Sequence, residues 1–398
     1  MSLHETVSAE RLHIGFFGIR NAGKSSLINA VTGQALSVVS DVKGTTTDPV
    51  LKAMELLPLG PVVIMDTPGI DDEGALGVLR VAKTKQILTK TDIAVLVADG
   101  ACGVTKEDGD LIHLFEEKKI PYLIAYNKAD IHTYGAMPEN AVAVSAKTGE
   151  GVEKLKEMLG AFAKQKKKTN TIVADLLNEG DLVVLVTPID EAAPKGRLIL
   201  PQQLTLREIL DVHATAIVCQ TEQLTDTLNA LGKKPALVIT DSQAFGKVNA
   251  LTPAEIPLTS FSILMARYKG DLTTLVEGAA ALGRLKDSDR VLISEGCTHH
   301  RQCNDIGTVK IPKWIESFTG VKPAFSFTSG GEFPEVLSDY DLVVHCGGCM
   351  LNETEMKNRI EKARAAGVPI VNYGVAIAHM HGILKRSLEP LGDMASVL

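Results

Sequence analysis

Residues 13–31 read HIGFFGIRNAGKSSLINAV, and this stretch decides the fold of the N-terminal part of the chain. The apolar run 13–17 predicts a strand, Gly18–Ser26 a phosphate-binding loop, and the pattern after it a helix. In such a loop the backbone N–H groups turn inward on phosphates at a helix N-terminus. Lys24 would place its charge beside the β- and γ-phosphates, and the Ser25 hydroxyl would ligate Mg²⁺. The stretch therefore predicts a nucleotide-binding domain.

Two further motifs complete the expected phosphate clamp. Asp-Thr-Pro-Gly at 66–69 follows an apolar run, so Asp66 can hold Mg²⁺ through water and the Gly69 N–H can sense the γ-phosphate. Thr46, in the segment Gly-Thr-Thr-Thr-Asp between the first helix and the next strand, supplies a switch threonine. We expect Lys24, Thr46, Asp66 and Gly69 to serve catalysis, with Ser25, Thr46 and Asp66 around Mg²⁺.

Two other motifs are expected to select guanine as the base of the nucleotide. Asn-Lys-Ala-Asp at 127–130 ends an apolar strand, and the Asp130 carboxylate can accept both donors of the guanine edge, an arrangement that adenine does not offer. Ser-Ala-Lys at 145–147 follows the next apolar run and would back the base. The residues expected to contact the nucleotide are Gly18, Asn21, Ala22, Gly23, Lys24, Ser25, Ser26, Asn127, Lys128, Asp130, Ser145, Ala146 and Lys147.

With five motifs in order, residues 11–165 resemble the GTPases of the translation-factor class related to MnmE and Era. The resemblance implies that Asn21 ligates a K⁺ ion in the place of an arginine finger, so we expect K⁺-stimulated GTP hydrolysis. Position 70 is Ile rather than the glutamine that positions water in Ras-like enzymes, and low intrinsic activity is therefore expected. The acidic residues 71–73 could orient the water instead, or form a solvated loop.

Composition places the chain among ordinary globular proteins. It has 398 residues, 45% hydrophobic and 22% charged, with a formal net charge of −7. No apolar run approaches the roughly 20 residues that cross a bilayer, and the N-terminus lacks the features of a secretory signal. The acidic balance disfavours nucleic acid as a partner. We expect a cytoplasmic protein without membrane contact.

Residues 171–259 alternate apolar segments with helical patterns and carry no chemical motif. The alternation predicts a small α/β domain. Its expected tasks are spacing and self-association, between which the sequence does not decide.

The C-terminal third holds a cluster of cysteines and histidines. The strand-like run 290–294 leads into Cys297 and His299, and the run 341–344 leads into His345, Cys346 and Cys349. Helical stretches separate these strands, so a parallel sheet would bring both loops to one edge. Three thiolates with nearby histidines suit either a closed zinc site or an iron–sulfur cluster with one open iron, and the spacing leaves the two open.

The combination of a GTPase part, a plain middle part and these cysteine loops resembles the HydF family, the GTPases that mature iron-only (FeFe) hydrogenase. The resemblance covers the whole chain and implies that Cys297, Cys346 and Cys349 carry a 4Fe-4S cluster, with His299 and His345 as candidates for its exchangeable fourth ligand. It further implies that the protein is a scaffold, and the scaffold role is not itself enzymatic. The scaffold would carry a diiron precursor from radical-SAM maturation enzymes to the immature hydrogenase.

Two alternatives remain. One is an RNA-modifying or ribosome-assembly GTPase with a structural zinc, and the other is a GTPase whose cluster senses oxygen or iron.

The sequence predicts an α/β protein with three domains, and we expect it to form a homodimer. The three domains are a P-loop GTP-binding domain at 1–168, a small α/β dimerisation domain at 169–260, and a Rossmann-like iron–sulfur domain at 261–398.

Overall fold

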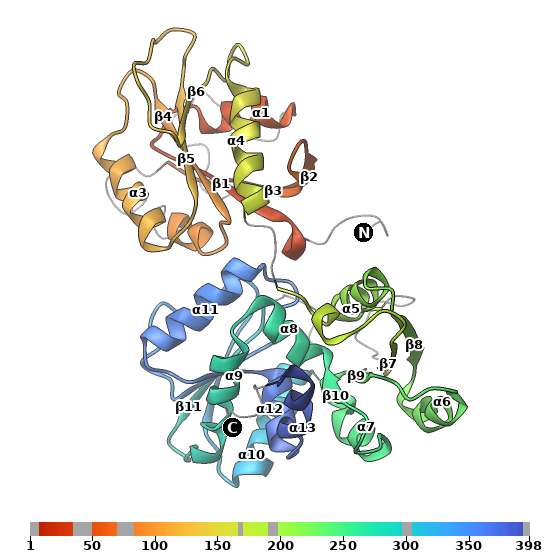
Figure 1. The fold of residues 1–398 in the computed structure, drawn as a ribbon. Coiled ribbons are helices and arrows are strands. Elements are labelled where there is room, and N and C mark those ends of the chain that lie inside the picture. The colour runs from red at the N-terminus through yellow and green to blue at the C-terminus, as the bar shows by residue number, and fades with distance from the viewer. Residues whose placement is uncertain are drawn as a thin grey trace. The chain divides into compact units, whose positions relative to one another are not determined.

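The computed structural model describes residues 8–34, 50–69, 83–165, 170–189, 198–296 and 305–392. The chain divides into two compact units, Met1–Lys168 and Thr169–Leu398, and each is considered by itself (Figure 1). Thr46, Cys297, His299 and the segment 70–73 lie outside the described residues.

The first unit contains a six-stranded sheet in the order β2-β3-β1-β4-β5-β6. Its strands are β1 (Leu12–Phe17), β2 (Val50–Leu56), β3 (Gly60–Asp66), β4 (Ile93–Asp99), β5 (Tyr122–Asn127) and β6 (Ala141–Ala143). Neighbouring strands are parallel except for β2 and β3. Among the helices of this unit, those with bounds inside the described residues include α1 (Lys24–Thr32), α3 (Lys106–Glu117) and α4 (Val152–Gln165).

Helices cover both faces of this sheet, which explains the continuous apolar runs of its strands. Successive side chains of a strand point to opposite faces. On β1, Phe16 packs into the core that α1 and α4 share, whereas Phe17 packs against α3. The ring centroids of Phe17 and Phe115 lie 5.3 Å apart. The apolar run before the phosphate loop is therefore a central strand buried on both sides.

The second unit contains two four-stranded sheets with the orders β10-β9-β7-β8 and β12-β11-β13-β14, and all pairs in both are parallel. The first sheet consists of β7 (Leu182–Val186), β8 (Thr215–Cys219), β9 (Leu237–Thr240) and β10 (Leu258–Ser260), with helices α5 (Leu200–Asp211), α6 (Leu224–Ala230), α7 (Phe245–Leu251) and α8 (Phe261–Lys269). The second sheet consists of β11 (Arg290–Ser294), β12 (Ala324–Thr328), β13 (Leu342–His345) and β14 (Ile370–Asn372), with helices α9 (Leu272–Ala279), α10 (Ile311–Thr319), α11 (Glu353–Ala365), α12 (Tyr373–Met380) and α13 (Leu384–Leu388).

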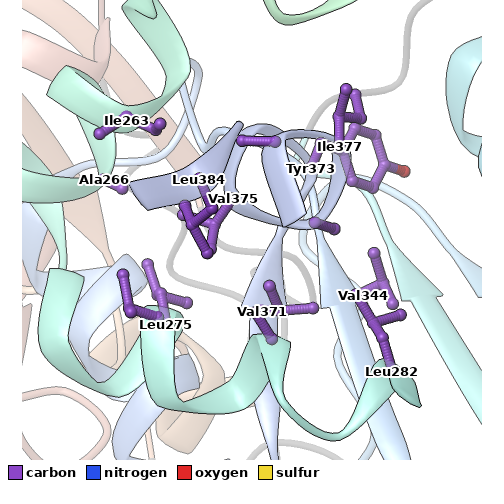
Figure 2. Close-up of a cluster of buried hydrophobic side chains, with 14 of the residues drawn as sticks. Ile263, Ala266, Leu275, Leu282, Val344, Val371, Tyr373, Val375, Ile377 and Leu384 are labelled. Atoms are coloured by element: carbon purple, nitrogen blue, oxygen red, sulfur yellow. The ribbon is translucent and has the colours of Figure 1, made fainter. Parts of the chain in front are cut away.

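One hydrophobic core joins these two sheets. It contains Val184 and Val238 of the first sheet together with Val344 and Val371 of the second. Figure 2 shows part of this core, to which α8, the helix between the sheets in sequence, contributes Ile263 and Ala266. The α/β class is confirmed, while the division of this unit at residue 260 stays a prediction. No helix in the described ranges is long and apolar enough to cross a membrane.

The contact between α9 and β14 leads to a stability prediction. A Cβ atom at Gly278 of α9 would lie 2.0 Å from the carbonyl oxygen of Ile370, whereas nothing lies within 4 Å of a Cβ at Gly246 of α7. We expect Gly278→Ala to lower the free energy of unfolding by about 1–3 kcal/mol through overpacking. Gly246→Ala should raise it by about 0.5–1 kcal/mol, because alanine loses less backbone entropy in a helix. Urea denaturation of both variants would check this, and shifts of the same sign would contradict it.

Candidate nucleotide site and metal centre

The phosphate loop follows β1 and depends on two glycines. Gly18 has a φ of 139° and Gly23 has a φ of 89°, and residues with a Cβ atom rarely adopt these backbone conformations. A Cβ at Gly18 would lie 2.4 Å from the Val97 carbonyl oxygen, and one at Gly23 would lie 2.2 Å from Nδ2 of Asn127. The loop therefore requires glycine at both positions for conformation and for space.

The side chains predicted to hold phosphate and Mg²⁺ lie at the start of α1. Lys24 is buried, and its Nζ donates hydrogen bonds to the carbonyl oxygens of Gly18 at 2.9 Å and Ile19 at 2.7 Å. Ser25 Oγ donates to Asp66 Oδ2 at 2.8 Å. The hydroxyl and the carboxylate, which are 41 residues apart in sequence, are thus already placed to share one cation.

Strand register explains how Asp66 reaches this place. Phe16 of β1 pairs with Asp66 of β3, so both strands end beside the phosphate loop. The chain continues to Gly69, where a Cβ would lie 2.8 Å from the backbone nitrogen of Arg20. Gly69 therefore packs directly on the loop, as a residue that senses the γ-phosphate must.

Asn127 joins the phosphate loop to the predicted base loop. Its Nδ2 donates to the Ala22 carbonyl oxygen at 2.9 Å, and its Oδ1 accepts the Ala146 N–H at 3.0 Å. The Ser145 hydroxyl donates to Asp130 Oδ1 at 2.8 Å and holds the pKa of that carboxyl below its usual value. Asp130 is thereby kept ionised and able to accept two hydrogen bonds from a base.

Asp99 and Tyr134, two residues outside the sequence motifs, support this arrangement. Asp99 Oδ2 lies 2.5 Å from Nζ of Lys128. Burial acts to raise the pKa of Asp99, but the hydrogen bonds from Lys128 and the Ala101 N–H, together with the nearby charges of Lys128 and His132, outweigh it, and the net direction is downward. The Tyr134 hydroxyl donates to the Asn127 carbonyl oxygen at 2.6 Å. Asp99 could have been found because it ends the strand next to β5, whereas nothing in the local pattern marks Tyr134.

Three other predicted nucleotide residues have clear positions without a contact that defines their role. Asn21 is exposed with a φ of 62°, Ser26 lies in the first turn of α1, and Lys147 is exposed after the base loop. Their contacts with GTP or K⁺ stay predictions.

The strands that precede the two cysteine segments end at one edge of the C-terminal sheet. Ser294 of β11 pairs with His345 of β13, so both strands end side by side. The Gly296 N–H donates to Cys346 Sγ at 3.0 Å, and the Gly348 N–H does so at 3.4 Å. Such bonds favour the thiolate, the form of sulfur that binds metal. Gly296, the residue directly before Cys297, thus contacts the second cysteine segment.

His345 is fully buried, and both of its ring nitrogens are engaged. Nδ1 lies 2.8 Å from the Cys346 carbonyl oxygen, which can only accept, so Nδ1 carries the proton. Nε2 lies 3.0 Å from a guanidinium nitrogen of Arg359. Burial and the Arg359 charge lower the pKa of His345 to about 3. In this arrangement His345 is a neutral link between Arg359 and the cysteine loop.

Arg359 is a residue that the sequence did not point to, since it lies in the highly charged helix α11. Its guanidinium donates to the Gly330 carbonyl oxygen at 2.7 Å and to Glu355 Oε1 at 2.8 Å, and it lies over the Phe333 ring. It thereby ties the loop after β12 to the end of β13. Among the residues that the structure describes, no group of three or more His, Cys, Asp or Glu is arranged around a common metal position, and Cys297 lies outside them.

Comparisons with known proteins match three stretches of the chain. Residues 13–128 match the 50S ribosome-binding GTPase family. The tRNA modification GTPase MnmE of Laribacter hongkongensis is 33% identical over 156 residues, which are 38% of this chain and 34% of the relative. GTPase Der of Maridesulfovibrio salexigens is 37% identical over 135 residues, 32% of this chain and 29% of the relative. The chain thus spans about a third of the length of these curated relatives.

A solved structure, Era in complex with MgGDPNP and a segment of 16S ribosomal RNA, is 24% identical to this chain with a TM-score of 0.34. The match covers 38% of this chain and 56% of that chain.

The phosphate loop, the Ser25–Asp66 contact and the base loop define the N-terminal unit as a P-loop GTPase domain. Residues 172–270 match the hydrogen maturase F dimerization domain, and residues 273–390 match its tetramerization domain. The chain belongs to the hydrogen maturase F family, and these two domains indicate that it oligomerizes.

The base loop leads to a prediction on nucleotide choice. Asp130→Asn replaces one acceptor by a donor, so one hydrogen bond to guanine is lost. Because a hydrogen bond to a charged group contributes about 1.5–3 kcal/mol, we expect GTP to bind about tenfold to a hundredfold more weakly. The preference for xanthosine triphosphate over GTP should rise, since xanthine presents an acceptor in place of the amino group. Calorimetric titration would measure both affinities. Asp110→Asn, at an exposed position of α3, is the matched control, and equal losses in the two variants would contradict the assignment.

Proposed function

We propose that this protein is the GTPase and 4Fe-4S scaffold of FeFe-hydrogenase maturation. It accepts a diiron precursor from radical-SAM maturation enzymes and delivers it to the immature hydrogenase. Family membership supports this function, and the observation that carries it is the Gly296 N–H bond to the Cys346 sulfur at 3.0 Å. That bond supports the proposal, because it joins the residue before Cys297 to a cysteine 50 residues further along the sequence.

In this proposal Cys297, Cys346 and Cys349 hold the cluster. Three protein thiolates leave one iron with an exchangeable ligand, which is the chemistry that a carrier needs. His345 would have to release Arg359 or the Cys346 carbonyl before it could bind iron. His299 is therefore the better candidate for the fourth position.

GTP hydrolysis serves as the switch. Lys24, Ser25, Thr46, Asp66 and Gly69 bind the phosphates and Mg²⁺. Phosphate oxygens would replace the two carbonyl oxygens that hold the Lys24 ammonium in this structure. Loss of the γ-phosphate releases contacts of the switch segments and so changes the contacts with partners. A homodimer in the cytoplasm is the expected working form.

The cluster assignment is tested by anaerobic reconstitution with iron and sulfide. We expect about four irons and four sulfides per chain and the EPR signal of a reduced 4Fe-4S cluster. Cys297→Ala, Cys346→Ala and Cys349→Ala should each lose most of that signal, because each removes a thiolate. Cys102→Ala, at an exposed position of the GTPase unit, should load like the wild type. Stoichiometric zinc without sulfide would instead favour a GTPase with a structural zinc site.

The K⁺ assignment is tested by rates of GTP hydrolysis in KCl and in NaCl at equal ionic strength. We expect hydrolysis to be several-fold faster in KCl, because K⁺ bound by the Asn21 amide oxygen would offset charge that develops on the phosphates. Asn21→Ala should remove the difference between the salts while GTP binding stays near that of the wild type. Lys24→Ala gives the background rate. A wild-type rate that is the same in both salts would rule the assignment out.

A further inference from the structure

Lys269, the last residue of α8, is buried at 1% exposure. A buried ammonium is costly unless acceptors surround it. Its Nζ donates to the carbonyl oxygens of Cys349 at 3.2 Å and Leu351 at 2.9 Å. Both acceptors belong to the turn that carries the second cysteine of the Cys-x-x-Cys pair, so this charge lies against that turn.

The turn itself is tight. Gly348 has a φ of 63°, and the Leu351 N–H donates back to the Gly348 carbonyl oxygen at 3.0 Å. Asn352 then caps α11 by accepting the Glu355 N–H at 2.9 Å. The turn is therefore fixed at its far end by a helix start and at its centre by Lys269.

Lys269 acts on the backbone of this turn. Its two acceptors are the carbonyl oxygens of Cys349 and Leu351, which lie on either side of Met350 in sequence. The two hydrogen bonds therefore fix the backbone from which the Cys349 side chain extends.

We propose that Lys269 is a positioning residue for Cys349: by donating to the carbonyl oxygens of Cys349 and Leu351 it fixes the turn that carries the sulfur. This inference rests on the proposed cluster-binding role of Cys349. With a cluster bound, the buried positive charge of Lys269 would favour the reduced state of the cluster.

The position of Lys269 is set by the shared core. Ile263 and Ala266 of α8 pack into the core that also holds Val344 of β13 (Figure 2). Lys269 belongs to the matched dimerization segment 172–270, whereas Cys349 belongs to the tetramerization segment 273–390. A displacement of α8 would therefore reach Cys349 directly through this side chain.

Lys269→Met keeps the length and apolar stem of the side chain and removes its charge. Lys357→Met, at an exposed position of α11, is the matched control. Hydrogen exchange measured by mass spectrometry on the metal-free full-length protein should show faster exchange of the amides in 346–352 for Lys269→Met, with the rest of the chain unchanged. In the reconstituted protein, EPR-monitored titration should place the midpoint potential of the cluster at a more negative value than in the wild type and the control.

Each result decides the proposal. Faster exchange confined to the turn, with a more negative potential or with loss of iron, supports it. Unchanged exchange in the turn, exchange that rises equally throughout the unit, or an unchanged potential in a fully loaded variant overturns it. If the wild type itself takes up no cluster, the proposed function fails. The exchange measurement on metal-free protein still decides whether Lys269 holds the turn.

Discussion

Parallel pairing of neighbouring strands is the constraint on which both sites depend. Strands that run in the same direction end at the same edge of a sheet, so the loops that follow them are neighbours. In the first unit this pairing sets Asp66 opposite Phe16, directly before the phosphate loop. In the second unit it sets His345 opposite Ser294, and the two cysteine loops begin from there. The same backbone geometry therefore builds a phosphate site in one unit and a thiol site in the other.

Side chains far from the motifs hold these loops in place. Asn127 spans the phosphate loop and the base loop, and Tyr134 in turn holds the Asn127 carbonyl. At the cysteine edge, Arg359 and Lys269 approach from α11 and α8. Buried charges of this kind are weak sources of net stability, because their desolvation offsets much of the attraction. Their effect is to hold the described parts of these loops in one arrangement.

The two sheets of the second unit share one core, and this core holds α8. The two matched oligomerization segments, 172–270 and 273–390, contribute their sheets to one continuous set of packed side chains. The helix α8 belongs to this shared core and ends at Lys269, which contacts the turn that carries Cys349.

The sequence by itself determined the phosphate loop, the Asp66 and Asp130 motifs and the α/β class. These signals are local, since each motif lies at the end of an apolar run whose type is readable from neighbouring residues. The parallel pairing of the strands before the two cysteine segments was also predictable, because strands separated by helices form parallel sheets. The assignments of Thr46, Cys297 and His299 lie outside the described residues and stay predictions.

Only the tertiary structure decided which side chains support the sites. Lys269 stands in sequence as an ordinary lysine in the last turn of a helix, and its acceptor lies 80 residues away. His345 belongs to a motif that suggests a metal ligand, yet its two ring nitrogens bind Arg359 and the Cys346 carbonyl. The joining of two sheets into one core was equally hidden. Apolar periodicity shows that a face is buried but not what it is buried against, because burial and long-range hydrogen bonds arise only when distant segments meet.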